Sequence, residues 1–178
     1  SSYFAKKKYD ILGFEPSLNV AKIARKKKLK VISNFFNYKN TSKLKNLKKK
    51  INLICAANVI CHIPNLRDLI KSIDLMLSKN GLFIFEEPYL GSMFKKVSYD
   101  QIYDAHVFIF SLHSVQSIFN SYGFDLIDAL AQKTHGGSMR YVVARKKVYK
   151  IKKRVKFLIN REKKLKLNKI SSCMRFKE

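Results

Sequence analysis

Residues 99–111 combine acid–base side chains with an adjoining apolar run. A tyrosine, an aspartate and a histidine stand within four positions, at Tyr103, Asp104 and His106, and the apolar residues 107–110 follow at once as a short strand or half-turn. Proteins tune pKa values where titratable groups adjoin buried surface, so this segment predicts acid–base chemistry. His106 is the best candidate for a general base, because the ordinary pKa of imidazole lies near neutrality.

Two further polar clusters contain histidine. Residues 57–64 read A-N-V-I-C-H-I-P, and residues 135–140 read H-G-G-S-M-R. His62 comes after an apolar run and before a proline, which predicts a loop beside a crevice. The paired glycines after His135 either let backbone approach a ligand closely or form a turn before the last strand. His113, the fourth histidine, is expected near a helix N-terminus without a role in the site.

Strands and helices that alternate along the chain must position these clusters. Apolar runs and turn signals predict strands over residues 9–14, 30–32, 51–57, 82–86, 124–129 and 139–144. Helical spacing predicts helices over residues 17–28, 41–49 and 66–77, and a fourth that starts at Ser111 or Ser114 and runs to residue 122. Ser17 is the expected N-cap of the first of these helices. Residues 51–57 are apolar apart from Asn52, and such a run is typical of a strand buried on both faces. The pattern indicates an open, mostly parallel α/β sheet with two antiparallel last strands, and ligands bind at the carboxyl ends of such strands.

Composition limits the class of protein. The chain has 178 residues, 47% of them hydrophobic, which predicts one globular domain. No run is long enough to span a bilayer, and no apolar segment follows the first lysines as a signal peptide requires. The cysteines are Cys55, Cys61 and Cys173, whose spacing fits neither a zinc site nor a disulfide framework, so we expect no metal. Cys55 and Cys61 are expected to be buried, reduced thiols in a cytoplasmic protein.

The net charge of +25 raises the question of nucleic acid. The basic residues are mostly lysine and lie all along the chain, whereas arginine supplies the bidentate contacts of specific readout. No zinc finger, GxxG loop or aromatic RNA-binding motif is present. We therefore expect no specific nucleic acid and no membrane as partner, although a positive field would help to collect an anionic substrate. Residues 146–170 predict a lysine-rich amphipathic helix that packs on a partner domain or lies on an anionic surface.

Five segments in this order resemble one family, the S-adenosylmethionine-dependent sugar C-methyltransferases that act on nucleotide-linked 4-keto-deoxysugars. The segments are G-F-E-P-S (residues 13–17), N-V-I-C-H-I-P (58–64), E-E-P-Y (86–89), Y-D-A-H (103–106) and H-G-G-S-M-R (135–140). The resemblance covers roughly residues 1–145 and implies a class I methyltransferase (Rossmann-like) fold, with S-adenosylmethionine as cofactor and a nucleotide-sugar as substrate.

The resemblance also implies roles for single residues. A proton must leave the carbon beside the keto group, with His106 as base, Tyr103 as donor to the enolate oxygen, and His62 in the site. Cofactor contacts are implied for Glu15, Pro16, Ser17, Ala57 and Asn58. Substrate contacts are implied for Glu87, Tyr89, His135 and Arg140.

The chain departs from the family pattern in two ways. The first strand and its glycine-rich cofactor loop are missing, so we expect a fragment: a partial methyltransferase domain over residues 1–145, and a basic helix or linker over 146–178 that leads towards an absent C-terminal domain. We expect that the family's metal-binding N-terminal domain also lies outside this fragment. In addition, Ala105 stands where the family has glutamate, and in an extended chain the neighbouring Asp104 points the other way.

Three hypotheses follow from these observations. The chain is a nucleotide-sugar C-methyltransferase domain, a truncated or degenerate homologue that keeps the fold without catalysis, or a basic module that binds nucleic acid or anionic membrane.

Overall fold

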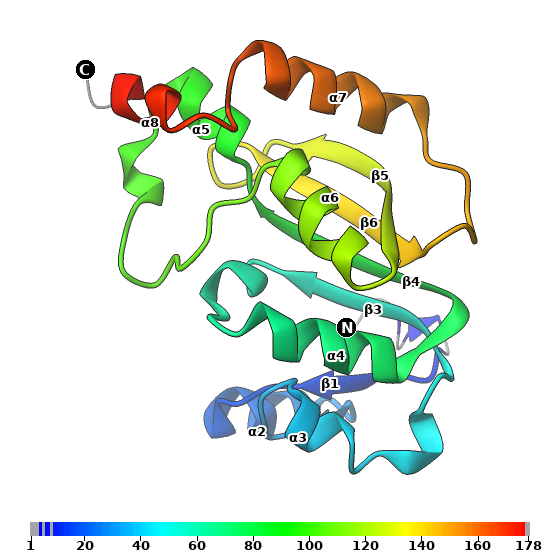
Figure 1. The fold of residues 1–178 in the computed structure, drawn as a ribbon. Helices are drawn as coiled ribbons and strands as arrows, with labels where there is room; N and C mark the ends of the chain where they lie inside the picture. The colour runs from blue at the N-terminus through cyan, green and yellow to red at the C-terminus, as the bar shows by residue number, and fades with distance from the viewer. Residues whose placement is uncertain (1–3, 5, 8, 177–178) are drawn as a thin grey trace. The chain divides into compact units, whose positions relative to one another are not determined.

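The computed structural model describes residues 4, 6–7 and 9–176 (Figure 1). These residues form two compact units, Ser1–Asn46 and Leu47–Glu178. Each unit has a sheet of its own, with two strands in the first and four in the second. None of the helices in the described part is long and apolar enough to cross a membrane.

A parallel strand–helix–strand motif makes up most of the first unit. β1 (Leu12–Phe14) and β2 (Lys30–Ile32) pair in parallel and are joined by α2 (Leu18–Lys26). The predicted N-cap residue Ser17 is confirmed in position, but its side chain makes no capping bond. Instead, Oε1 of Glu15 accepts a hydrogen bond from the Ser17 N–H at 2.8 Å, which fixes the turn from β1 into α2.

The helix predicted over residues 41–49 is wrong. The chain forms a shorter helix, α3 (Tyr38–Thr41), and then a separate 3-10 turn, η1 (Lys45–Leu47). The side chain of Asn37 accepts from the N–H of Asn40 and so starts the helix earlier than expected. The lysine-rich residues that follow offer no continuous apolar stripe to hold a longer helix against a core.

The second unit is built on a four-stranded sheet with the order β3-β4-β6-β5. Its strands are β3 (Ile51–Ala57), β4 (Leu77–Pro88), β5 (Phe124–Gln132) and β6 (Ser138–Arg145). β3 and β4 are parallel, and β6 runs antiparallel to both β4 and β5, as predicted for the two last strands. The carboxyl ends of β3 and β4 therefore lie at the same edge of the sheet, where the predicted site residues follow them.

Helices flank this sheet. They are α4 (Leu66–Met76), α5 (Leu90–Lys96), α6 (Leu112–Ser121), α7 (Lys153–Lys164) and α8 (Ile170–Phe176), with 3-10 turns at η2 (Ile60–His62) and η3 (Tyr99–Gln101). α4 confirms the prediction from helical spacing. α6 begins at a capping box formed by Ser111 and Ser114, so both serines proposed as its start take part.

Alternation along β4 builds the core. Phe83, Phe85 and Glu87 point to the buried face. The Phe85 ring stacks on Tyr141 of β6 at 4.8 Å between centroids. Phe119 of α6 contacts both phenylalanine rings. Glu87 thus shares the face of the aromatic core, while Glu86 lies on the opposite face.

The prediction that β3 is buried on both faces is wrong. Leu53 is 41% exposed, and Cys55 is exposed rather than buried. Within its sheet β3 is an edge strand that pairs with β4 alone, so its apolar side chains receive cover from one neighbour. The buried state predicted for Cys61 is confirmed, and the Cys173 side chain lies outside the described part.

The lysine-rich helix predicted over residues 146–170 forms over a shorter span, as α7 (Lys153–Lys164). It packs on α6 and β5 of its own unit. Val155, Ile159 and Glu162 face this contact and are buried. The Glu162 carboxylate accepts from the N–H groups of Leu112 and His113, at 2.7 and 2.9 Å, and from the Tyr89 hydroxyl at 2.9 Å. One acid on α7 therefore holds the start of α6 and the residue that leads into α5. A further C-terminal domain stays a prediction.

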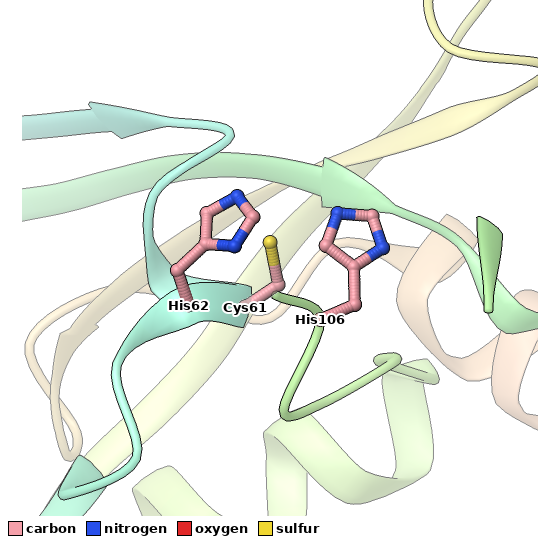
Figure 2. A group of neighbouring side chains, drawn as sticks. All are labelled: Cys61, His62 and His106. Atoms are coloured by element: carbon pink, nitrogen blue, oxygen red, sulfur yellow. The ribbon is translucent and has the colours of Figure 1, made fainter. Parts of the chain in front are cut away.

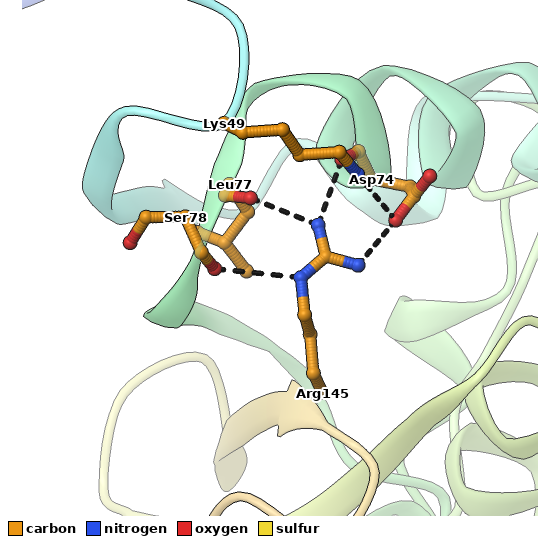
Figure 3. A network of polar contacts seen from close by, with 5 residues as sticks. All are labelled: Lys49, Asp74, Leu77, Ser78 and Arg145. Carbon is orange, nitrogen blue, oxygen red and sulfur yellow. Dashed lines mark hydrogen bonds and ion pairs between the residues drawn. The ribbon is translucent and has the colours of Figure 1, made fainter.

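Arg145, near the end of β6, joins the sheet to the end of α4 (Figure 3). Its guanidinium pairs with the Asp74 carboxylate and donates to the carbonyls of Asp74 and Leu77, both at 2.8 Å. Nζ of Lys49 lies 3.0 Å from the same carboxylate. Burial raises the pKa of Asp74, but hydrogen bonds from Arg145 and Lys49 lower it more, so the net shift is downward.

This network predicts a loss of stability in acid. A carboxyl whose pKa is lower in the folded state stabilises the fold above its ordinary pKa, and that contribution disappears as pH falls through the folded value. Asp74→Asn should therefore flatten the fall of the unfolding free energy below about pH 4, measured by urea denaturation between neutral and acid pH. Asp104→Asn, a change at an exposed loop residue, should leave the wild-type pH profile intact. Equal profiles for wild type and Asp74→Asn would contradict the assignment.

Candidate active site

The pair Tyr103–His106 forms in a turn rather than in an extended segment. The N–H of His106 donates to the carbonyl of Tyr103 at 2.9 Å, so the extended chain predicted here, with Asp104 pointing away by alternation, is wrong. Of the two alternatives for residues 107–110, a short strand or a half-turn, the strand does not form: within the described chain this segment contributes an isolated bridge between Phe110 and Tyr89. Phe110 is buried, whereas Val107 is exposed.

Hydrogen bonds define the tautomer of His106. Its Nδ1 lies 2.8 Å from the Gln101 carbonyl, which can only accept, so Nδ1 carries the proton. Its Nε2 lies 2.9 Å from the Tyr103 hydroxyl, which donates to it. Nε2 therefore keeps its lone pair as an acceptor and lies beside the Tyr103 hydroxyl. This is the arrangement that a neutral imidazole base requires.

His62 lies next to this pair. Its ring centroid is 5.0 Å from that of His106, although 43 residues separate His62 from the nearby Ala105. Nδ1 of His62 donates to the Ala105 carbonyl at 2.6 Å, and the N–H of Phe108 donates to the Cys61 carbonyl at 3.2 Å. The structure thus brings together the three predicted catalytic residues and ties their two loops to each other.

Glu87 holds the turn that carries His62. Its Oε1 accepts from the N–H groups of Val59 and Ile60, at 3.0 and 2.7 Å, and its side chain is fully buried. Glu87 therefore has a structural task, which residue order alone did not suggest. Its contact with substrate stays a prediction. The atom available for that contact is Oε2, which has no hydrogen-bond partner among the described residues.

Glu87 also raises the pKa of the neighbouring Cys61 thiol. Burial raises the pKa of Cys61, and the adjacent Glu87 carboxylate raises it further. Replacing Glu87 by glutamine should therefore lower the pKa of Cys61 and speed its alkylation at mildly basic pH. A Cys55→Ser, Cys173→Ser background removes the other two thiols, and iodoacetamide labelling across pH gives the measurement. An unchanged labelling profile would mean that Glu87 does not act on Cys61.

Predicted substrate residues gather around a small pocket. Its lining includes Pro88, Tyr89, Gln101, His135 and the glycines at 136 and 137. His135 has a positive φ of 48°, a conformation that non-glycine residues adopt rarely. The pocket joins Tyr89 and His135 to Gln101, whose carbonyl orients His106. The Tyr89 hydroxyl donates to the Glu162 carboxylate at 2.9 Å.

Arg140 does not line this pocket. It sits opposite Glu86 across β4 and β6, and its Nε and Nη2 bind Oε2 of Glu86 at 3.2 and 2.9 Å. The other oxygen of Glu86 accepts from the Thr134 hydroxyl at 2.8 Å. Glu86 therefore fixes both ends of the turn that presents His135. Direct binding of substrate by Arg140 stays a prediction.

The predicted cofactor residues fall on both units. Glu15, Pro16 and Ser17 form the β1–α2 turn of the first unit. Ala57 and Asn58 end β3 in the second unit, where Asn58 has a positive φ of 52° and donates its N–H to the Glu86 carbonyl at 2.9 Å. Oδ1 of Asn58 is buried, and no group in the described part of the chain hydrogen-bonds to it. A buried acceptor of this kind fits a ligand that brings a donor.

Sequence reasoning missed the roles of Gln101, Glu162 and Cys61. Gln101 orients His106 through its backbone carbonyl, and a side-chain motif cannot predict a backbone contact. Glu162 had a signal, because it is the acid on the apolar stripe of a lysine-rich helix. Cys61 lies in an apolar run, which predicts a core thiol. Its spacing from His106 in the sequence does not predict that the two side chains lie close together.

The chain is similar in sequence to known methyltransferases. A family model described as a methyltransferase domain matches residues 1–129. The chain is also similar to the C-methyltransferase NovU of Streptomyces niveus, with 27% identity over 129 residues that cover 72% of this chain. Those residues are 31% of NovU, so the chain spans about a third of the length of this relative.

Solved methyltransferases share the fold. One is a SAM-dependent methyltransferase from Anabaena variabilis, with a TM-score of 0.60 and 13% identity, covering 82% of this chain and 72% of that one. Another is the 1,6-didemethyltoxoflavin-N1-methyltransferase of Burkholderia thailandensis, solved with its namesake compound and S-adenosylhomocysteine. Its TM-score is 0.57 at 12% identity, with coverage of 81% and 64%. The predicted class I methyltransferase fold is confirmed, and the family match over residues 1–129 shows that this chain belongs to the methyltransferase domain family.

Proposed function

We propose that this chain carries out methyl transfer from S-adenosylmethionine to a carbon beside the keto group of a nucleotide-linked deoxysugar. The observation that carries the proposal is the Tyr103–His106 pair, in which hydrogen bonds leave Nε2 of His106 as the acceptor nitrogen. Membership of the methyltransferase domain family supports the methyl donor. Similarity to a C-methyltransferase supports a carbon as the acceptor.

A carbon nucleophile is made by removing a proton. Nε2 of His106 takes the proton from the carbon beside the keto group, and the C–H electron pair moves towards the keto oxygen to give an enolate. The Tyr103 hydroxyl, which is 2.9 Å from Nε2, turns to donate to that oxygen. S-adenosylmethionine, when bound, supplies an electrophilic methyl group to the enolate carbon.

The surrounding residues suit a polar substrate. His62 keeps Nε2 as an acceptor for a sugar hydroxyl, because its Nδ1 is bound to the Ala105 carbonyl. The pocket that Tyr89 and His135 help to line would hold the distal part of the substrate. Asn58 would accept a hydrogen bond from the cofactor through its Oδ1, which has no partner among the described residues.

The test is the fate of a labelled methyl group. The protein is incubated with methyl-labelled S-adenosylmethionine and a nucleotide-linked 4-keto-6-deoxyhexose, and the product is located by mass spectrometry and NMR. The proposal expects a new carbon–carbon bond beside the former keto carbon. Label on oxygen or nitrogen would overturn it.

We also propose that the chain acts as part of a longer protein, because it aligns with 31% of NovU. Calorimetry with S-adenosylmethionine and S-adenosylhomocysteine tests this, on the 178-residue chain and on a form that includes preceding sequence. Tighter binding by the longer form supports the proposal, and equal binding contradicts it. Cofactor binding without turnover would favour a degenerate homologue, and Ala105→Glu would then test whether the missing carboxylate is the cause.

A further inference from the structure

Cys61, His62 and His106 form a compact cluster of metal-binding side chains (Figure 2). One ligand atom of each, the sulfur and a ring nitrogen of each imidazole, lies within 4.8 Å of the others. Figure 2 shows the sulfur between the two rings. A tetrahedral zinc ion, with bonds of about 2.3 Å to sulfur and about 2.0 Å to nitrogen, would hold these atoms about 3.5 Å apart. The side chains would therefore close by roughly 1 Å around an ion.

The two histidines already have the tautomer that a metal site needs. Each directs Nδ1 at a backbone carbonyl, Ala105 for His62 and Gln101 for His106, which leaves both Nε2 lone pairs for a ligand bond. A ring N–H held by a carbonyl is the usual outer contact of a metal-bound histidine. Tyr103 donates to Nε2 of His106 in this structure, but its side chain is half exposed and free of the core, so it can turn away.

A buried negative charge lies beside the cluster. Glu87 is fully buried, and its Oε2 lacks a hydrogen-bond partner among the described residues. A divalent ion beside it would be attracted by this buried carboxylate. Glu87 also holds the turn that carries Cys61 and His62, so the ligands sit on a fixed support.

We propose that Cys61, His62 and His106 bind a divalent ion of the zinc class, with water or the Tyr103 hydroxyl in the fourth position. Thiolate and imidazole are the ligands that zinc and cobalt prefer. Binding releases the Cys61 proton to solvent, and the ion takes the Nε2 lone pair of His106. The ion-bound form therefore lacks the proposed base, which makes the site inhibitory for methyl transfer. The binding itself does not depend on the proposed function.

Cobalt(II) provides the test. The Cys55→Ser, Cys173→Ser double variant of the 178-residue chain keeps Cys61 as its one thiol, and it is titrated with cobalt chloride. We expect a thiolate-to-cobalt charge-transfer band in the near ultraviolet, visible bands of tetrahedral cobalt, and displacement of both by zinc. Adding Cys61→Ser should remove the charge-transfer band. His62→Ala should weaken binding by more than the roughly 10–100-fold that loss of an outer contact costs.

Several outcomes would overturn the proposal. They are the absence of the charge-transfer band in the double variant, its survival in Cys61→Ser, and unchanged affinity in His62→Ala. His62 is exposed, so its replacement should keep the fold, and circular dichroism verifies this. Calorimetry with S-adenosylmethionine on the same samples separates the two proposals: cobalt binding without cofactor binding would count against the proposed function alone.

Discussion

Replacing Glu162 by alanine should lower the free energy of unfolding by about 1–3 kcal/mol for each buried donor that it leaves unpaired. Its carboxylate accepts three hydrogen bonds, two from the first N–H groups of α6 and one from the Tyr89 hydroxyl. Hydrogen bonds to charged groups contribute about 1.5–3 kcal/mol each. The variant leaves the Leu112 N–H and the Tyr89 hydroxyl without this acceptor in a buried setting, where water replaces it poorly.

The same change also removes a negative charge from the positive end of a helix dipole. Glu162→Gln should cost less, because the amide oxygen still accepts from α6. Tyr89→Phe removes one of the three bonds and should cost about 1.5–3 kcal/mol. Lys163→Ala on the exposed face of α7 is the matched control and should change little. Urea unfolding measures all four variants, and a loss below about 1 kcal/mol for Glu162→Ala would show that α7 does not secure α6.

The sequence predicted those parts of the fold that local pattern controls. α4 follows from helical spacing and α6 from the serines expected to start it, and the antiparallel pair β5–β6 follows from two apolar runs joined by a glycine turn. β3 shows the limit of this reasoning. A largely apolar run indicates which side chains a strand is able to bury. The position of β3 at the edge of its sheet determines which of them are buried. Pairing is a tertiary property that composition does not report.

The candidate site divides in the same way. Tyr103 and His106 lie three positions apart, so a turn brings them together, and their types alone indicated chemistry. His62 reaches Ala105 across 43 residues, and Glu162 reaches Leu112 across 50. Such contacts depend on how strands and loops end in space, which a single sequence does not report. Glu87 is an intermediate case, because alternation from Phe83 and Phe85 would have put it on the core face.

Loss of the His106 imidazole should slow proton abstraction by roughly 10²–10⁴-fold, the usual contribution of a positioned general base. The reason is geometric: Nδ1 is held by the Gln101 carbonyl, so Nε2 is the acceptor and faces outward beside Tyr103. Exchange of the substrate proton beside the keto group into deuterium oxide, followed by NMR, isolates this step because it needs no methyl donor. His106→Ala is compared with wild type, and His113→Ala, which changes a histidine on α6, is the matched control.

Tyr103 and His106 should fail in different ways. Tyr103→Phe keeps the base but removes the donor to the enolate oxygen, so exchange and methyl transfer should both slow, by roughly 10²–10³-fold for loss of one such donor. His106→Ala should slow exchange by roughly 10²–10⁴-fold while leaving calorimetric cofactor binding intact, because His106 is not among the predicted cofactor residues. Exchange at the wild-type rate in His106→Ala would move the role of base to another group, and His62, whose ring lies 5.0 Å away, would be tested next.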